Sequence, residues 1–515
     1  MRRQALQESP THTERAHPET VRRRPHRWHQ LGLVALLAAS CVKNPVTGAR
    51  ELSLLSPEQE KRIGQEAAAE VENFVGLTDD PALRSYIRQV GVSLVQHSPR
   101  QGVDYRFDVI DMAVPNAFAL PDGHLYVSRG MLALTNAEAE LAAILAHEIG
   151  HVAARHAAQR YSRAAPVGIL AGLTSAVVGV VSARAANAVT DFGGGLNSVM
   201  LAPYGREQER EADKVGQDIA FASGRDPGAL SSALRNVGRF EEHVLGAGGQ
   251  TSWLDSHPRT SQRVADTDRY ARSLALARSP TVERNQVEHV RRLDGLLLGK
   301  NARHGVFRGQ RFVHPELGIT VRFPPGWRTE STKPMAGALA PQDDAFFMMG
   351  VLGKGEDPLH AAGDFARDAE LTYSQRPVAR SIGALPGAQA RVVVENLDIT
   401  LAFVALGDRI LQLLAVTRPE RLRAYAPVIE NWFGSLDHAS DHLLAGIREE
   451  RLSVIAVEQD VPLVQLLARQ ASSAPPLLVA ILNGMDSPTA RPPLPVIKLP
   501  ILTAYRSRDR ARRTN

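Results

Sequence analysis

The chain has 515 residues, 44% of them hydrophobic, which suits a globular protein of about two to four domains. The formal net charge is +5, but the basic residues gather at 22–27 and 506–513, and both signs are mixed elsewhere. This distribution argues against a surface for nucleic acid. The single cysteine excludes an internal disulfide and a multi-cysteine zinc cluster, so a metal would need His, Asp or Glu ligands.

Residues 1–41 predict a secretion signal. The basic stretch at 22–27 precedes an apolar segment, 31–39, that is too short for a stable spanning helix, and Ser40-Cys41 follow. The small residue before Cys41 resembles the lipobox of bacterial lipoproteins, although Ala38 stands where leucine is usual. Two interpretations stay open. Either a lipidated Cys41 anchors a periplasmic protein to a membrane, or a signal peptide precedes an incidental cysteine.

The next elements follow from local signals. Residues 44–48, Asn-Pro-Val-Thr-Gly, predict a turn that forms a tether, and Ser56 followed by Pro57 predicts the start of a helix. Residues 105–111 and 123–127 predict two strands joined by a loop. Because residues 135–160 are rich in alanine, leucine and glutamate, they predict one long helix.

The predicted long helix contains the run His147-Glu148-Ile149-Gly150-His151. Two histidines four residues apart lie on one face of a helix, so both imidazoles can reach one Zn²⁺ ion. Glu148 flanks the same face, where it can take a proton from a water that zinc activates. The residues just before the run are apolar, which favours a buried catalytic helix over a solvated one.

A second polar segment, 206–213, offers the third protein ligand that a catalytic zinc usually needs. Glu209 and Asp213 are four residues apart and share one face of a predicted helix. Glu209 can ligate the metal, and Asp213 can accept a hydrogen bond from a ligand imidazole and fix its tautomer. Taken alone, the alternation of Arg and Glu is equally typical of an exposed helix with ion pairs. Its place after the two histidines favours the metal.

Several motifs agree in order and spacing with one family. They are Asn116-Ala117-Phe118-Ala119, Glu138-Ala139-Glu140-Leu141 ahead of the run from His147 to His156, and the run from Arg206 to Asp213 with Gly216. In these motifs residues 41 to about 270 resemble the HtpX and CAAX-prenyl-protease-like zinc peptidases. Cys41 and the turn at 44–48 resemble the secreted lipoprotein branch of that family, which is related to the β-barrel assembly-enhancing protease.

The resemblance implies that His147, His151 and Glu209 hold one zinc ion per chain. It also implies a gluzincin core, a largely helical domain with a small sheet whose edge holds the substrate as an added strand. His257, in Ser256-His257-Pro258, matches another family element and has two interpretations. It stabilises the oxyanion or caps the open zinc position at rest, or it is a structural histidine at a helix start. The remaining nearby histidines, His124 and His156, are interpreted as packing or surface residues.

Three further regions lie outside these motifs. Residues 166–183 are apolar and uncharged, which favours a helical hairpin or lid over the site, with a membrane span as the alternative. Residues 308–437 predict an α+β domain of unassigned role, with strand-like runs at 318–323, 346–352, 391–395 and 410–417. Residues 451–500 predict a βααβ unit with its strands at 453–457 and 496–499, which resembles a degenerate LysM module, a binder of glycans such as peptidoglycan. Because Gln459-Asp460-Val461 replaces the usual Gly-Asp-Thr, a packing role is an equal alternative.

The sequence therefore predicts a multidomain protein: a mainly α gluzincin peptidase domain with a small sheet at 42–300, then the α+β domain and the LysM-like unit. We expect a zinc metalloendopeptidase that acts on unfolded or misassembled envelope proteins. The catalytic residues would be Glu148, Asp213 and His257. The rival interpretation is a chaperone-like or peptidoglycan-binding envelope factor with a shut or vestigial zinc site. The intact ligands and Glu148 favour the enzyme.

Overall fold

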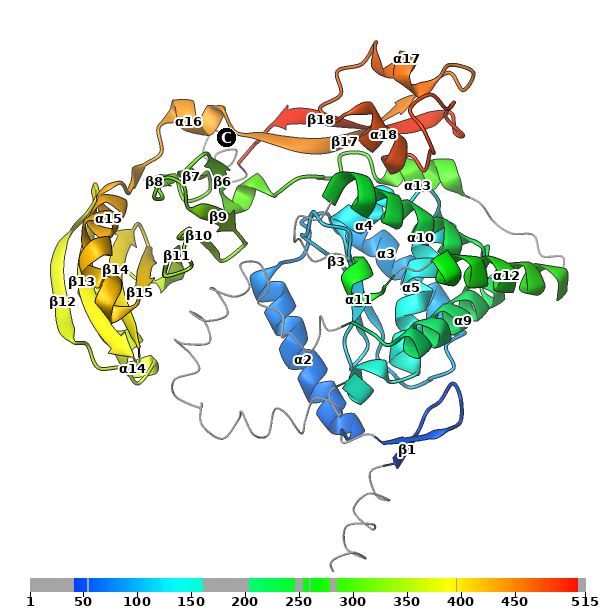
Figure 1. Cartoon of the computed structure of the whole chain (residues 1–515), viewed down its shortest axis with the longest axis horizontal. Coiled ribbons are helices and arrows are strands. Elements are labelled where there is room, and N and C mark those ends of the chain that lie inside the picture. The colour runs from blue at the N-terminus through cyan, green and yellow to red at the C-terminus, as the bar shows by residue number, and fades with distance from the viewer. Residues whose placement is uncertain are drawn as a thin grey trace, which may run out of the picture.

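The computed structural model describes residues 41–52, 55–160, 203–245, 253–258, 261–277, 285–394 and 396–507. The predicted signal segment before Cys41 and the apolar segment 166–183 lie outside this part of the chain. Among the described helices, none combines the length and the apolar character needed to cross a bilayer. Figure 1 shows a helical body, a separate sheet-rich unit, and a long C-terminal hairpin that reaches from one to the other.

The helical body surrounds a small sheet. Its helices are α2 (Pro57–Phe74), α3 (Pro81–Val95), α4 (Arg129–Leu134), α5 (Glu138–Ala153), α9 (Arg206–Ala222), α10 (Ala229–Phe240), α11 (Trp253–Ser256), α12 (Ser261–Ala277) and α13 (Gln286–Arg292), with a π-helical turn at Glu241–Leu245. The sheet has the order β3-β5-β4, from β3 (Arg106–Ile110), β5 (His124–Ser128) and β4 (Ala117–Ala119). Strand β3 is parallel to β5, and β4 is antiparallel to it. The predicted helical region with a small sheet is confirmed.

Helix α5 is shorter than the predicted helix over 135–160. It begins at Glu138 and ends at Ala153, and the chain forms a turn before a further helical stretch at 156–160. Arg155 causes this break, because its φ of 58° lies in the left-handed region that residues other than glycine rarely adopt. An ion pair with the buried Glu60 of α2 holds Arg155 in this place. The break turns the residues after α5 back towards the site.

Helices α5 and α9 approach each other at two glycines. A Cβ atom on Gly216 would lie 2.8 Å from the backbone nitrogen of His147, and one on Gly150 would lie 3.0 Å from the carbonyl oxygen of Ala212. Without side chains at these two positions, the backbones pack directly against each other. This contact brings the polar face of α9 next to the two histidines of α5.

The sheet-rich unit has helices on both faces of an antiparallel sheet. Its strands are β6 (Val306–Arg308), β7 (Arg311–His314), β8 (Ile319–Arg322), β9 (Arg328–Ser331), β10 (Met335–Leu339), β11 (Ala345–Lys354), β12 (Gln375–Ile382), β13 (Leu385–Val394), β14 (Leu397–Leu406), β15 (Arg409–Thr417) and β16 (Asp437–His438). Seven of them form a sheet in the order β12-β13-β14-β15-β11-β10-β9, and the other four form the order β16-β8-β7-β6. Helix α14 (Pro358–Asp368) packs on one face of the larger sheet and α15 (Leu422–Gly434) on the other.

The last part of the chain packs on the helical body. It comprises α16 (Asp441–Ala445), β17 (Arg448–Ala456), α17 (Leu463–Leu467), α18 (Pro476–Leu482) and β18 (Val496–Ala504), with β17 antiparallel to β18. The predicted order strand, helix, helix, strand is present. Residues 295–298 run along β17, where the Gly295 amide donates to Leu452 and the Leu452 amide to Leu296, each at 2.8 Å. Leu452 and Ile481 belong to the same hydrophobic cluster as α5, so this unit shares the core of the helical body.

Candidate metal centre

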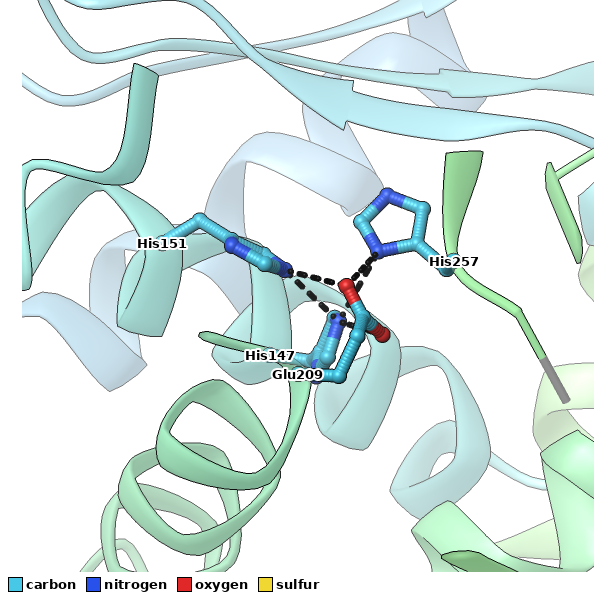
Figure 2. Close-up of side chains that lie close together, drawn as sticks. All are labelled: His147, His151, Glu209 and His257. Atoms are coloured by element: carbon cyan, nitrogen blue, oxygen red, sulfur yellow. Dashed lines mark hydrogen bonds and ion pairs between the residues drawn. The ribbon is translucent and has the colours of Figure 1, made fainter. Parts of the chain in front are cut away.

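Four buried side chains from three parts of the helical body meet at one point (Figure 2). His147 and His151 come from α5, Glu209 from α9, and His257 from the residue after α11. One ligand atom from each lies within 4.8 Å of all the others. The Nε2 atoms of the two α5 histidines are 3.0 Å apart, and Oε1 of Glu209 lies 3.4 Å from His151 Nε2 and 3.0 Å from His257 Nδ1. All four residues are at most 3% exposed.

The donor set suits a zinc ion. Three imidazoles and one carboxylate are ligands that zinc prefers, and a catalytic zinc keeps three protein ligands and one exchangeable position. Within the described residues, Glu148 Oε2 and His257 Nε2 are buried and have no hydrogen-bond partner. Buried polar atoms are normally paired, so such atoms in a native protein call for a ligand or an ion. Unpaired atoms beside clustered imidazoles therefore agree with a metal site.

Asp213 and Arg263 support the cluster from behind. Oδ1 of Asp213 lies 3.0 Å from Nδ1 of His147, which is the contact that its spacing from Glu209 predicts. The guanidinium of Arg263, from α12, donates to both oxygens of Asp213 at 2.7 Å and lies 2.6 Å from Oε2 of Glu209. One arginine thus holds the carboxylates of both Glu209 and Asp213, and its planar fork fixes their orientation.

Glu148 faces the cluster from α5 but is not one of its four donors. Its Oε1 accepts a hydrogen bond from the indole of Trp253 at 3.2 Å and lies 3.6 Å from His257 Nε2. Its side chain is fully buried, and this burial raises the pKa of Glu148 to about 7. A carboxyl group with a pKa in this range can both accept and release a proton near neutral pH.

Burial and neighbouring charges set the protonation of the donors. Burial lowers the pKa of His151 and of His257, which favours the neutral form of both imidazoles. Burial alone would raise the pKa of Glu209, but His257, His151 and Arg263 outweigh it and hold that pKa well below its usual range. Neutral imidazoles and an ionised carboxylate are the forms that bind a metal.

Two aromatic residues of the site were not predicted. The ring of Tyr204 stacks on the imidazole of His151, with ring centroids 3.8 Å apart, and its amide donates to the carbonyl of Ser256 at 3.0 Å. Trp253 is fully buried and contacts Glu148. Neither residue belongs to a spaced pattern. Only their nearness in the sequence could have identified them, since Tyr204 precedes the polar segment at 206–213 and Trp253 precedes His257.

The cluster lies inside a segment that matches a known family. The model of peptidase family M48 matches residues 81–271, which include both helices of the site and His257. Residues 81–271 form a peptidase family M48 domain. Zinc is the metal of M48 metallopeptidases, and the His147 cluster fits that ion. The predicted relationship to this class of zinc peptidases is therefore confirmed.

Curated relatives of the M48 domain are proteases by name. The beta-barrel assembly-enhancing protease of Escherichia coli K12 is 29% identical over 226 residues, which cover 43% of this chain and 46% of that protein. The mitochondrial metalloendopeptidase OMA1 of Schizosaccharomyces pombe is 28% identical over 223 residues, which cover 43% of this chain and 63% of that protein. The human OMA1 metalloendopeptidase is 28% identical over 236 residues, which cover 44% of this chain and 45% of that protein. The chain thus spans about half the length of these relatives.

Similarity to solved structures is weak. The cyanobacterial PsbP protein from Synechocystis sp. PCC 6803 has a TM-score of 0.22 at 12% identity and covers 26% of this chain and 95% of that protein.

Proposed function

We propose that the protein is a zinc metalloendopeptidase that hydrolyses peptide bonds of unfolded or misassembled envelope proteins. The observation that carries this proposal is the meeting of four buried donor atoms within 4.8 Å inside the M48 domain. The names of the relatives agree with it, since one is a protease that enhances beta-barrel assembly and another is a metalloendopeptidase.

We assign His147, His151 and Glu209 as the zinc ligands. Oδ1 of Asp213 lies 3.0 Å from Nδ1 of His147, so the carboxylate faces this nitrogen and leaves Nε2 of the ring for the metal. Bound zinc supplies Lewis acidity to a water molecule and to the scissile carbonyl. Arg263 fixes the two carboxylates and so keeps the ligand face of α9 in register with α5.

Glu148 is the general base and acid in this proposal. Its Oε2 is buried beside the donors and has no hydrogen-bond partner among the described residues, so it can accept the proton of the attacking water and then give it to the leaving amine. The indole of Trp253 holds the other oxygen and thereby orients the carboxyl group. A positioned general base of this kind contributes about 10²–10⁴-fold to the rate.

His257 closes the site at rest. Its Nδ1 lies 3.2 Å from Nε2 of His147 and 3.0 Å from Oε1 of Glu209, so the ring occupies the side of the cluster where a fourth ligand belongs. The contacts of this buried ring with two donors favour the capping role over that of a structural histidine at a helix start. Entry of a substrate then requires His257 to withdraw from Glu209.

The substrate adds to the sheet as an extended strand. Strand β4 pairs on one side with β5 and, within the described residues, has no other neighbour in the sheet. An edge strand offers backbone groups to a peptide without reading its sequence, which suits an enzyme for misassembled proteins. A lipidated Cys41 would attach the enzyme to a membrane on the periplasmic side. Contact with peptidoglycan through residues 451–500 is a separate proposal, which retention of the full chain on purified peptidoglycan would test.

Casein cleavage by the zinc-loaded wild type and by Glu148→Gln tests the proposed activity. We expect the variant to lose at least about 100-fold of the rate, because the proton acceptor is gone, while its zinc content stays the same. Glu207→Gln is the matched control, since this exposed side chain of the neighbouring helix α9 contacts Arg210 and should keep full activity. Cleavage by Glu148→Gln at the wild-type rate would refute its role. A zinc-loaded but inactive wild type would favour the chaperone-like factor.

A further inference from the structure

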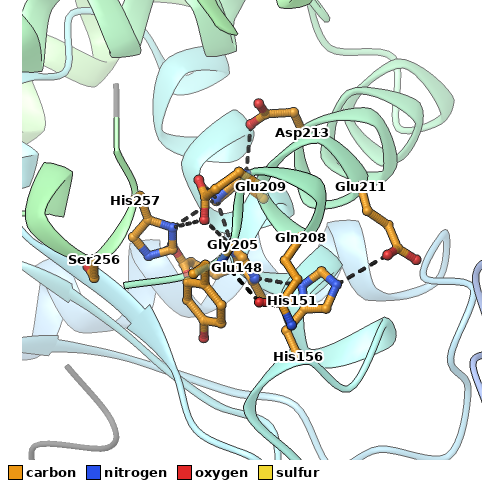
Figure 3. A network of polar contacts seen from close by, with 12 residues as sticks. Glu148, His151, His156, Gly205, Gln208, Glu209, Glu211, Asp213, Ser256 and His257 are labelled. Carbon is orange, nitrogen blue, oxygen red and sulfur yellow. Dashed lines mark hydrogen bonds and ion pairs between the residues drawn. The ribbon is translucent and has the colours of Figure 1, made fainter. Parts of the chain in front are cut away.

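A line of polar contacts runs from the metal centre to the N-terminal hairpin. Nδ1 of His151 lies 2.8 Å from Nδ1 of His156, and Nε2 of His156 lies 3.3 Å from Oε2 of Glu211 (Figure 3). The side-chain NH₂ group of Asn44 then donates to Oε1 of Glu211 at 3.1 Å. Both histidines and Asn44 are at most 1% exposed. The line joins α5, the helical stretch after it, α9 and the hairpin of β1 (Cys41–Lys43) and β2 (Arg50–Leu52).

Zinc binding at His151 fixes which atom donates and which accepts in every hydrogen bond of this line. A His151 that offers Nε2 to zinc carries its proton on Nδ1, so it donates to Nδ1 of His156. His156 then carries its own proton on Nε2 and donates to Glu211. The second oxygen of Glu211 accepts from Asn44. A change at any of these residues therefore reaches the tautomer and the orientation of His151.

Asn44 is held for this contact by its own turn. Its side-chain oxygen accepts the amide of Val46 at 2.8 Å and the amide of Thr47 at 3.3 Å, and its backbone carbonyl accepts the amide of Gly48 at 2.9 Å. Since the oxygen of the side chain is used by the turn, its NH₂ group is directed at Glu211. Val46 packs against the core of the helical body and fixes the hairpin there.

We propose that His156, Glu211 and Asn44 are positioning residues for the zinc ligand His151. Through Asn44, the hairpin of residues 41–52 then helps to hold the metal centre in its binding geometry. This inference rests on the proposed zinc peptidase function. It gives His151 the kind of support that Asp213 gives to His147, and it gives the turn at 44–48 a role beyond that of a tether. Displacing the hairpin would therefore weaken the hold on zinc.

The variant Asn44→Asp tests the line at the end farthest from the metal. It keeps the side-chain oxygen that the turn needs, but it sets a second carboxylate against Glu211. We expect the zinc-loaded full chain to release zinc to a chelator about 10–100-fold faster, with kcat reduced and KM unchanged. The double variant Asn44→Asp with Glu211→Gln reverses this contact, because the glutamine amide donates to the aspartate and its oxygen still accepts from His156. We expect it to recover most of the retention of zinc.

His156 gives a second test with an internal rescue. His156→Phe removes the acceptor for His151 Nδ1, whereas His156→Asn provides a side-chain oxygen that can replace it, so the asparagine variant should hold zinc more tightly. His124→Phe is the matched control, since His124 forms a comparable pair with Asp122 at 2.7 Å outside the metal centre. Thermal unfolding of the metal-free proteins shows whether each variant folds.

The outcomes separate the two proposals. A wild type that binds no zinc, or that cleaves no protein when loaded, contradicts the proposed function. A wild type that binds zinc and cleaves casein, together with Asn44→Asp and His156→Phe variants that release zinc at the wild-type rate, contradicts the positioning role alone. Failure of the double variant to recover also contradicts it, because a reversed pair restores the contact.

Discussion

Helix α5 carries a buried polar cluster at each end, and the two clusters differ in how fully they are satisfied. At the N-terminal end, Glu140 accepts the amide of Asn136 at 2.7 Å and the hydroxyl of Ser232 at 2.6 Å. Lys498 of β18 reaches the same region and donates to the carbonyls of Ala133 and Thr135, each at 2.7 Å.

At the C-terminal end of α5 the pairing is incomplete. Within the described residues, Glu148 Oε2 and His257 Nε2 stay without a hydrogen-bond partner although both are buried. A satisfied polar cluster joins elements and stabilises the fold, as Lys498 joins the last part of the chain to the helical body. An incompletely satisfied cluster of ligand-type side chains is suited to an ion. The comparison therefore separates a structural cluster from a binding cluster on one helix.

Removal of zinc should have the largest effect on stability, because only the C-terminal cluster depends on an ion. Zinc present at about 1,000 times its dissociation constant stabilises the folded state by about 4 kcal/mol, which corresponds to roughly 8–16 °C in Tm for a domain of this size. Calorimetry with and without a chelator measures the shift. The variant Glu209→Ala should respond to the chelator far less. An unchanged Tm of the wild type would contradict the interpretation of this cluster as a metal site.

Gly216→Ala should disturb the centre through the packing of α5 and α9. The added Cβ would lie 2.8 Å from the backbone nitrogen of His147, so the helices must separate, at a cost of about 1–3 kcal/mol in the free energy of unfolding. Zinc should also bind more weakly, since Glu209 moves with α9. Gly363→Ala on α14 is the control, because a Cβ there would meet no atom of the described residues within 4 Å. Urea unfolding with equal losses in both variants would show that the close approach has no special role.

Lys498→Met should leave zinc binding unchanged and alter how stability depends on pH. Burial lowers the pKa of Lys498 to about 7, while the unfolded chain keeps a value near 10.5. Between these values the unfolded state binds more protons, so the stability that this group confers rises with pH. From pH 8 to pH 10 the wild type should gain about 1 kcal/mol per pH unit relative to the variant. Urea unfolding at several pH values measures the difference, and a constant difference would mean that Lys498 stays charged.

The binding cluster was predictable from the sequence for a local reason. His147, His151, Glu209 and Asp213 come in pairs four residues apart on two helices, and helical geometry alone places each pair on one face. His257 lies close to both pairs because of how α11 packs, and the spacing of residues along the chain does not predict this packing. The same holds for His156, which the break at Arg155 turns back towards the site.

The structural cluster and much of the larger sheet were harder to predict. The segment 496–499 was predicted as a strand, but a pattern of residue types does not show that its lysine is fully buried, because buried lysines are rare. Strand β12 was missed because it is largely exposed and contains a proline, as edge strands often do. Most of strand β11 was predicted, at 346–352, because that run is apolar, and the structure buries its first half. The burial of a lysine and the pairing of strands depend on contacts between residues that lie far apart in the sequence, which a local pattern does not show.

The zinc content of the purified protein tests the central claim most directly. Elemental analysis after dialysis should find one zinc ion per chain in the wild type and in Glu148→Gln, because Glu148 is not a ligand. It should find far less than one in Glu209→Ala, which lacks the carboxylate that lies between His151 and His257. A wild type that holds no zinc, or a Glu209→Ala variant that retains a full complement, would contradict the account.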